Sequence, residues 1–261
     1  CIETLDPTYA TENWTSIDEG VTFSVICGTE EQDSLWHVAT TGSDASGDGS
    51  QDNPFSTIQT GINAAGDGNR VQVAAGTYVE NLSYNGKSIS ITGEDRETTV
   101  VDGDSSGAVL LFDGNDSHTI HLSGLTITNG NNSYGGGIGI EDGLNIDISD
   151  LIITGNIASS GGGVLIASST GFLSDLIISD NEANSSGGFS CYDSDLELDN
   201  LYIHDNNGLN NAGGASFGSS TINMHSSVFT GNHAHYNGGA IRVGGEGDFN
   251  FTNVSIIGNS T

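Results

Sequence analysis

The 261-residue chain is predicted to be an all-β protein, a right-handed parallel β-helix, because two independent markers recur with one period. The first marker is an Asn that closes a short apolar run. It recurs at steps of 25 to 27 residues, at Asn156, Asn181, Asn206, Asn232 and Asn259. The second marker is a glycine pair whose last member recurs at steps of 25 or 26 residues, at Gly137, Gly163, Gly188, Gly214 and Gly239. A period that both markers share indicates a stack of equivalent coils.

The first segment, residues 1–34, carries no repeat, and we predict a leader or the tail of a preceding module there. Cys1 and Cys27 fall in this segment and either pair or stay as thiols, whereas Cys191 falls in the repeats. The chain begins with Cys rather than Met and ends in mid-repeat. We therefore expect a piece of a longer chain that is truncated at its C-terminus.

Residues 55–65 are predicted to form a short capping helix at the start of a β-helix that covers residues 35–261. Phe55, Ile58 and Ile62 recur at helical spacing, and Ser56 is of a residue type that caps helix starts. The open end of a stack exposes unpaired strands and core side chains. A short amphipathic helix before the regular coils is therefore expected to act as a lid.

The regular coils are predicted to span residues 119–261, each with two strands before the Asn and one after the glycine pair. Apolar residues fall in columns when the repeats are aligned on the Asn. One column holds Ile120, Ile146, Leu196, Ile222 and Phe249, and another holds Ile127, Ile153, Ile178, Ile203, Phe229 and Ile256. Alternation within a strand turns these columns inward. Strands of successive coils run the same way and must therefore pair in parallel.

The composition excludes some classes of partner. Thirty-four acidic residues stand against four basic ones, for a formal net charge of -30. Nucleic acid is excluded because neutralising its phosphates requires Lys and Arg. Acidic polysaccharides would also be repelled unless divalent cations bridge them. No apolar run approaches the about 18 residues of a membrane span.

Two parts of the chain resemble known families. The segment from Trp36 to Gly103, with the stretches HVATTGSD, NPFSTIQTGINAA and VQVAAGTYVENL, resembles the N-terminal portion of secreted pectate-lyase-like β-helix proteins. The repeats resemble the FxxN and GGAI motifs of polymorphic outer-membrane autotransporter adhesins, most closely at Phe229–Asn232 and Gly238–Ile241. These resemblances imply the β-helix fold and an extracellular or bacterial cell-surface location. They do not select an activity, because the superfamily contains lyases, hydrolases, adhesins and structural shafts.

The recurring Asn and Gly residues are interpreted as structural. Stacked amide side chains can hydrogen-bond along a column and satisfy backbone groups of the turn. Asp180 and Asp205 directly precede two of these Asn residues, and stacking on adjacent coils would place them about 5 Å apart. Such a pair could share Ca²⁺, act as an acid–base pair, or occupy solvated turn positions.

Arg242 is the one basic residue of the regular coils. Counted from the glycine pair, it falls in the inward column of Ile140, Ile166, Cys191 and Phe217. Three interpretations stay open. The strand shifts phase so that Ile241 and Val243 point inward, the guanidinium is buried against an acid, or Arg242 is the base of a β-elimination lyase.

A second candidate metal site lies before the capping helix. Asp44 and Asp48 match the opening half of a calcium loop, and Asp52 could add a third carboxylate. Phe55 at the twelfth position excludes an EF-hand. The alternatives are therefore a looser Ca²⁺ site or a surface loop.

Two functions remain in competition. The first is a secreted or cell-surface β-helix without catalysis, acting as an adhesin-like shaft or a carbohydrate-binding passenger for an extracellular glycan or a host-cell ligand. The second is a Ca²⁺-assisted polysaccharide lyase or hydrolase. The adhesin-type repeats and the scarcity of basic residues favour the first.

Overall fold

The computed structural model describes residues 2–3, 23–24, 34–112, 119–141 and 143–261. The chain divides into two compact units, residues 1–34 and 35–261. In the first unit, β1 (Ile2–Glu3) pairs in parallel with β2 (Phe23–Ser24). Cys1 and Cys27 lie outside the described residues, so their pairing stays a prediction.

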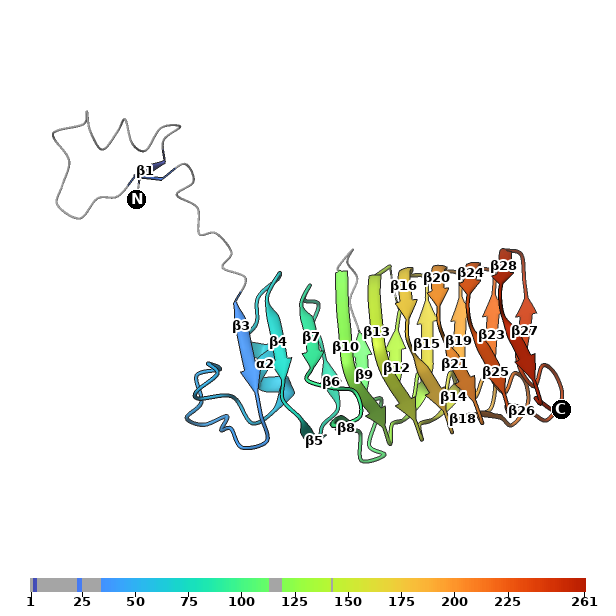
Figure 1. Cartoon of the computed structure of the whole chain (residues 1–261), viewed down its shortest axis with the longest axis horizontal. Helices are drawn as coiled ribbons and strands as arrows, with labels where there is room; N and C mark the ends of the chain where they lie inside the picture. Colours follow the sequence, from blue (N-terminus) through green and yellow to red (C-terminus); the bar gives the residue numbers. More distant parts are fainter. Residues whose placement is uncertain (1, 4–22, 25–33, 113–118, 142) are drawn as a thin grey trace. The chain divides into compact units, whose positions relative to one another are not determined.

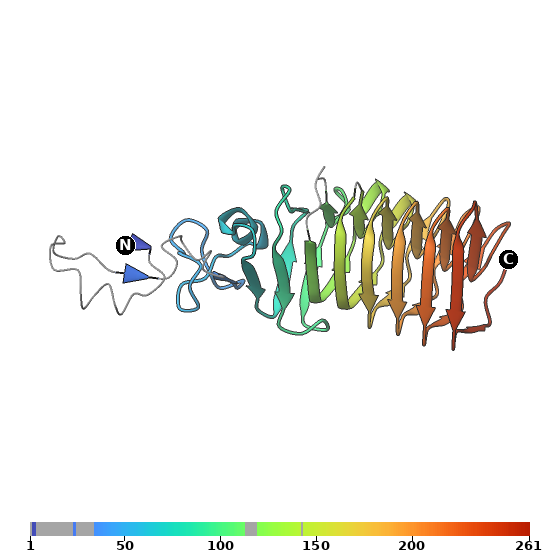
Figure 2. The same ribbon diagram turned by 90° about the horizontal axis from the view of Figure 1, so that it is seen from above.

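The second unit is a right-handed parallel β-helix, which confirms the predicted fold class. Successive coils stack along one axis in the order of the sequence (Figures 1 and 2). Each regular coil has four sides, named here faces A to D. Faces A, B and D correspond to the three strands predicted for a coil. Face C is a short additional strand between the Asn and the glycine pair.

The strands of each face run as follows. Face A consists of β3 (Leu35–Val38), β4 (Arg70–Val73), β7 (Ser90–Gly93), the first half of β10 (Thr119–Thr128) and of β13 (Asn145–Thr154), β16 (Thr170–Ser174), β20 (Asp195–Asp199), β24 (Thr221–His225) and β28 (Asp248–Thr252). Face B consists of β5 (Gly76–Val79), β8 (Thr99–Asp102), the second halves of β10 and β13, β17 (Ile177–Ser179), β21 (Tyr202–His204), β25 (Val228–Thr230) and β29 (Ser255–Ile257).

Faces C and D complete the coils. Face C consists of β11 (Asn131–Tyr134), β14 (Ile157–Ser160), β18 (Glu182–Ala183), β22 (Asn207–Gly208) and β26 (His233–Ala234). Face D consists of β6 (Leu82–Ser83), β9 (Leu110–Phe112), β12 (Ile138–Ile140), β15 (Val164–Ala167), β19 (Phe189–Tyr192), β23 (Ala215–Gly218) and β27 (Ile241–Gly244).

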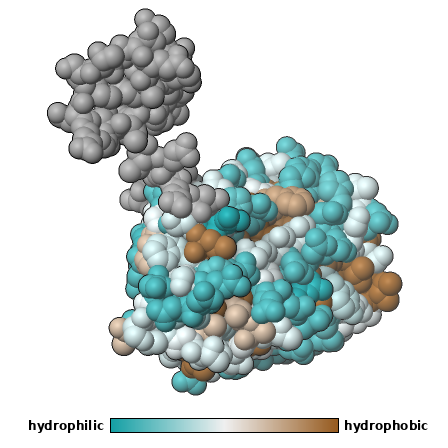
Figure 3. Space-filling model, turned by 60° about the vertical axis from the view of Figure 1, so that its left-hand side comes forward, coloured by the Kyte–Doolittle hydropathy of each residue, from teal (hydrophilic) through white to brown (hydrophobic). Residues whose placement is uncertain are grey.

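The apolar columns form the core. The register places Ile120 opposite Ile146 and Ile127 opposite Ile153, and each of these four side chains is at most 2% exposed. Cys191 packs inward opposite Ile166 on face D, as predicted. Burial raises the pKa of the Cys191 thiol to about 11, so this thiol stays neutral in the core. On the side that Figure 3 shows, the surface is mainly hydrophilic, with small separate apolar patches.

The corners between faces are built from residues in the left-handed backbone region. The A–B corner is formed by Gly124, Asp150, Asp175, Asn200, Ser226 and Asn253, all with φ between 50° and 71°. The B–C corner is formed by Asn129, Gly155, Asp180, Asp205, Gly231 and Gly258, with φ between 54° and 67°. Gly, Asn and Asp adopt this conformation most easily. Corner geometry therefore explains why the residue before each of the five recurring Asn residues is Gly or Asp.

The glycine column follows from close packing of successive coils. A Cβ at Gly188 would lie 2.5 Å from the carbonyl oxygen of Gly214 on the next coil. In the last repeat the column shifts by one residue. Ala215 pairs with Ile241, so Ala240 rather than Gly239 follows Gly214 in the column.

Helix α2 (Ile58–Ala64) covers the N-terminal end of the core and buries Ile58, Gly61 and Ile62. A Cβ on Gly61 would lie 2.9 Å from methyl groups of Val38 and of Val71, so the helix backbone rests directly on β3 and β4. The predicted helix is confirmed but begins later than expected. Thr57, not Ser56, is the N-cap residue. No helix within the described residues has the length and apolarity needed to cross a membrane.

Candidate functional site

A groove of about 390 Å³ lies along the A–B corner. Its polar wall is made by Asp150, Asp175 and Asn200, which occupy the same corner position on three successive coils. The spacing of parallel strands sets these side chains about 4.8 Å apart along the axis. Leu176, Ile177 and Tyr202 supply the apolar wall, and Arg96 completes the lining.

Arg96 reaches the groove from an earlier coil. In that coil the A–B corner is a loop, residues 94–98, between β7 and β8. Arg96 Nη1 lies 3.2 Å from Asp150 Oδ1 and donates a hydrogen bond of 2.9 Å to the carbonyl oxygen of Asp175. The Arg96 side chain is 25% exposed and that of Asp150 55% exposed. The guanidinium is thus fixed in place while its carboxylate partner stays open to solvent.

Hydrogen bonding and aromatic stacking shape the far end of the groove. Asn200 Nδ2 donates to Asp175 Oδ1 over 2.7 Å. Tyr202 points outward from β21, is 42% exposed, and stacks on the His204 ring with centroids 4.2 Å apart. The Nδ1 atom of His204 lies 2.8 Å from Asp205 Oδ2. Tyr202 is therefore an oriented, accessible aromatic face beside a row of hydrogen-bonding groups.

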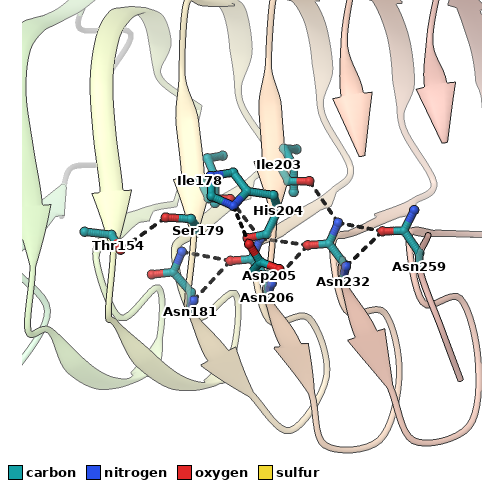
Figure 4. A network of polar contacts seen from close by, with 10 residues as sticks. All are labelled: Thr154, Ile178, Ser179, Asn181, Ile203, His204, Asp205, Asn206, Asn232 and Asn259. Atoms are coloured by element: carbon teal, nitrogen blue, oxygen red, sulfur yellow. Dashed lines mark hydrogen bonds and ion pairs between the residues drawn. The ribbon is translucent and has the colours of Figure 1, made fainter. Parts of the chain in front are cut away.

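The five ladder Asn residues lie at the corner between faces B and C. Asn181 Nδ2 donates to Asn206 Oδ1 over 3.0 Å, and Asn206 Nδ2 donates to Asn232 Oδ1 over 2.9 Å. The same contact joins Asn156 to Asn181. It also joins Asn232 to Asn259, and Figure 4 shows the ladder from Asn181 to Asn259. Each Nδ2 also donates to a backbone carbonyl of the preceding coil, as Asn206 does to Ile178 over 2.8 Å. The ladder is a structural element of the core, since Asn156, Asn181, Asn206 and Asn232 are at most 1% exposed.

Asp180 and Asp205 are exposed residues of the B–C corner on adjacent coils. Their left-handed backbone conformation accounts for their residue type. Asp205 is engaged by His204 (Figure 4). Neither residue lines the groove at the A–B corner.

Arg242 lies on face D, outside that groove. It pairs with Ser216, while Val243 pairs with the core residue Phe217. Of the three interpretations of Arg242, the register agrees with a phase shift of the strand, and the Arg242 side chain is exposed. The inward column counted from the glycine pair does not extend to Arg242, because the last repeat has one additional residue between the glycine pair and the strand. Asp180, Asp205 and Arg242 are thus not brought together in one site.

The three acidic residues of the predicted calcium loop have separate positions. Asp44 accepts hydrogen bonds from the backbone N–H of Ser56 and Thr57, at 2.8 and 3.1 Å, and from Thr57 Oγ1 at 2.8 Å. Partial burial acts to raise the pKa of Asp44, but these hydrogen bonds together lower it below its ordinary value. Asp48 accepts from Ser50 N–H at 3.0 Å, and Asp52 is exposed. Within the described ranges, no three His, Cys, Asp or Glu residues form a group suited to a metal ion.

The groove residues were not among the sites predicted from the sequence. A signal for part of them was present, because Asp150, Asp175 and Asn200 recur at steps of 25 residues. Arg96 carried no such signal, since its loop belongs to an irregular coil and only the folded structure brings it beside Asp150.

Comparisons with known proteins return a family match and a structural similarity. Residues 40–113 match a family described as a protein of unknown function, DUF1565. Among solved structures, the chain is similar to XylC, in a structure described as its complex with xylose. That similarity has a TM-score of 0.48 and 11% sequence identity, and covers 85% of this chain and 66% of the XylC chain. A comparison with curated proteins returns no match.

Proposed function

We propose that this protein is a carbohydrate-binding β-helix, secreted or displayed on a bacterial cell surface, that holds an extracellular glycan in the groove at the A–B corner. The observation that carries the proposal is the position of Tyr202. Its exposed ring, stacked on His204, stands beside the row of Asp150, Asp175 and Asn200.

This combination matches the chemistry of a sugar ring. The C–H face of a pyranose is apolar and packs on an aromatic plane, whereas its hydroxyl groups require donors and acceptors at the ring edge. Tyr202 and Ile177 supply the apolar surface. Asp150, Asp175, Asn200 and Arg96 supply acceptors and donors, spaced by the rise of about 4.8 Å per coil. A linear glycan lying along the axis would meet equivalent groups on successive coils.

The surroundings of the carboxylates favour binding over catalysis. A catalytic acid is usually buried, so that its pKa rises toward the working pH. Asp150 is instead more than half exposed and lies 3.2 Å from the Arg96 guanidinium, so it lacks the burial of a catalytic acid. Asp175 is likewise exposed and accepts a hydrogen bond from Asn200.

The test is a glycan-array screen followed by calorimetry on the glycans retained. Tyr202→Ala is expected to weaken binding about tenfold or more, which corresponds to about 1.4 kcal/mol. Tyr236→Ala is the matched control, because Tyr236 is 64% exposed and does not line the groove. Unchanged affinity of the Tyr202 variant, or an equal loss in the control, would contradict the proposal.

A second candidate is a Ca²⁺-assisted polysaccharide lyase or hydrolase, favoured by one observation. Arg96 lies in a groove with two carboxylates on successive coils, and a β-elimination needs a base close to a site that neutralises the sugar acid. Digests of pectate, alginate and neutral glycans with and without Ca²⁺ separate the two functions. Product formation that Arg96→Ala abolishes would establish the enzyme. Binding without any product would leave the carbohydrate-binding function.

A further inference from the structure

We infer that the glycan is cationic, a polymer of amino sugars that carry free amines. The inference rests on the proposed carbohydrate-binding function and deepens it by assigning the ligand class. It follows from the charge left over in the groove, the charge of the surrounding protein, and the position of the aromatic ring.

The groove retains a net negative charge after its internal pairing. Arg96 is the one cation among its lining residues, and its Nη1 atom is committed to Asp150 Oδ1 and to the backbone oxygen of Asp175. Among the residues that the structure describes, the Asp175 carboxylate is paired only with the neutral amide of Asn200. No Lys, Arg or His in the described part of the chain is in ion-pair contact with that carboxylate. A cation from outside would therefore meet an uncompensated charge.

The net charge of the whole chain also favours a cationic ligand. The formal net charge of -30 disfavours uronates and sulfated sugars and attracts polycations. Asp180 and Asp205 on the neighbouring B–C corner extend the negative surface across face B. No bridging metal is required for a cationic polymer, whereas a polyanion would need one.

Tyr202 distinguishes an amino sugar from an unspecific polycation. The face of an aromatic ring attracts an ammonium group as well as an apolar C–H surface. A glycan with free amines offers both, and its hydroxyl groups can pair with Asn200 and Asp150. A Lys-rich peptide offers the charge but not the rigid row of hydroxyl groups.

The experiment compares four soluble oligosaccharides by calorimetry on the full chain, at low and at physiological salt. They are a chitosan oligomer, its fully N-acetylated counterpart, a cello-oligosaccharide and an oligogalacturonate. Oligolysine is titrated beside them as a polycation without sugar. Chitosan is expected to bind about tenfold more tightly than the acetylated form at low salt, with the difference narrowing as salt rises. Asp175→Asn is expected to reduce that affinity ratio to near one, and Asn tolerates the left-handed corner.

Asp193→Asn is the matched control, because Asp193 is an exposed corner residue with φ of 52° outside the groove. It should leave the ratio unchanged, and an equal effect of both variants would overturn the inference in favour of overall charge. Equal or tighter binding of the acetylated or cello-oligosaccharide would overturn the cationic assignment but leave carbohydrate binding intact. Binding of oligolysine but of no sugar would overturn both proposals.

Discussion

The regular coils and the N-terminal end of the same β-helix satisfy their buried polar groups in opposite ways. The coils use uncharged side chains, whereas the end beneath helix α2 uses charged ones. The difference follows from the neighbours that the buried polar groups have on the coils before and after them.

In the coils, a ladder Asn away from the two ends has an equivalent Asn on the coil before it and on the coil after it. Asn206 accepts a hydrogen bond from Asn181 and donates to Asn232, at 3.0 and 2.9 Å. A second ladder of Ser residues runs along the corner between faces D and A, where Ser169 N–H donates to Ser194 Oγ over 3.1 Å. Amides and hydroxyls can donate and accept at once, so they repeat without limit. A column of identical charges would instead repel itself.

At the N-terminal end the groups to be satisfied are the termini of α2. The Glu80 carboxylate accepts from the N–H groups of Ile58 and Gln59, at 2.8 and 3.0 Å. Lys87 Nζ donates to three carbonyl oxygens at the helix C-terminus, those of Ile62, Asn63 and Ala65, at 2.8 to 3.0 Å. Helix ends carry partial charges of opposite sign, so an acid suits the first turn and a base the last.

Breaking the ladder should have the largest effect. Asn206→Ala is expected to lower the free energy of unfolding by about 3–5 kcal/mol, because several buried backbone and amide groups lose their partners at about 1–3 kcal/mol each. Urea denaturation measures the change. Asn207→Ala is the control, since Asn207 is only partly buried and donates to Glu182, so its loss should stay below about 1 kcal/mol. Equal effects would show that the ladder carries no special stability.

Removing the cation beneath the helix should have the next effect. Lys87→Met keeps the length of the side chain but leaves three helix carbonyls without their donor. The expected loss is about 1.5–3 kcal/mol, the usual range for hydrogen bonds to a charged group. The exposed Arg242 provides the control variant Arg242→Met, which should change stability by less than about 0.5 kcal/mol. A Lys87 variant as stable as wild type would contradict the idea that the charge of Lys87 stabilises the C-terminal end of α2.

The pH dependence of stability should reside in the lid. Burial raises the pKa of Glu80 above its ordinary value of 4.5, against the hydrogen bonds from Gln59 and Ile58 that lower it. A raised pKa means that the contribution of Glu80 is fully present below 4.5 and is lost as pH rises through the folded-state pKa. Asp44 has the opposite sign. Its contribution is present above the ordinary value of 3.8 and is lost as pH falls through its lowered folded-state pKa.

Stability curves from urea denaturation at a series of pH values check both signs. Glu80→Gln should flatten the decline on the alkaline side of pH 4.5, and Asp44→Asn should flatten the loss on the acidic side of pH 3.8. Asn206→Ala should shift the whole curve without changing its slope. A change of slope in the Asn206 variant would contradict the division between charged and uncharged regions.

The smallest effect concerns Tyr84, whose hydroxyl is buried without a hydrogen-bond partner among the described residues. Its ring packs on Phe112 with centroids 4.2 Å apart, and burial strongly raises the pKa of the phenol. Tyr84→Phe removes an unsatisfied polar atom and should stabilise the protein by up to about 1 kcal/mol in thermal unfolding. A clear destabilisation would indicate a partner for the hydroxyl.

Sequence reasoning predicted the coils better than the lid and the groove. The helix was found from its apolar spacing, but its start was placed at Ser56. Asp44, 12 residues upstream, binds Ser56 N–H and so holds Ser56 outside the helix. For Arg242, counting from the glycine pair left three interpretations open, because the count cannot detect one additional residue in the turn. The pairing of Ala215 with Ile241 reveals that shift.

The repeated spacing by itself determined the parallel β-helix, its apolar columns and the stacking of the Asn residues. Each coil contacts mainly the coils before and after it, so a period in the sequence translates directly into neighbours in space. Only the tertiary structure decided which irregular segments meet the stack. The loop of residues 94–98 brings Arg96 to Asp150, and Glu80 and Lys87 reach the two ends of α2. These contacts join residues outside the period, and they depend on how far each side chain reaches across a folded surface.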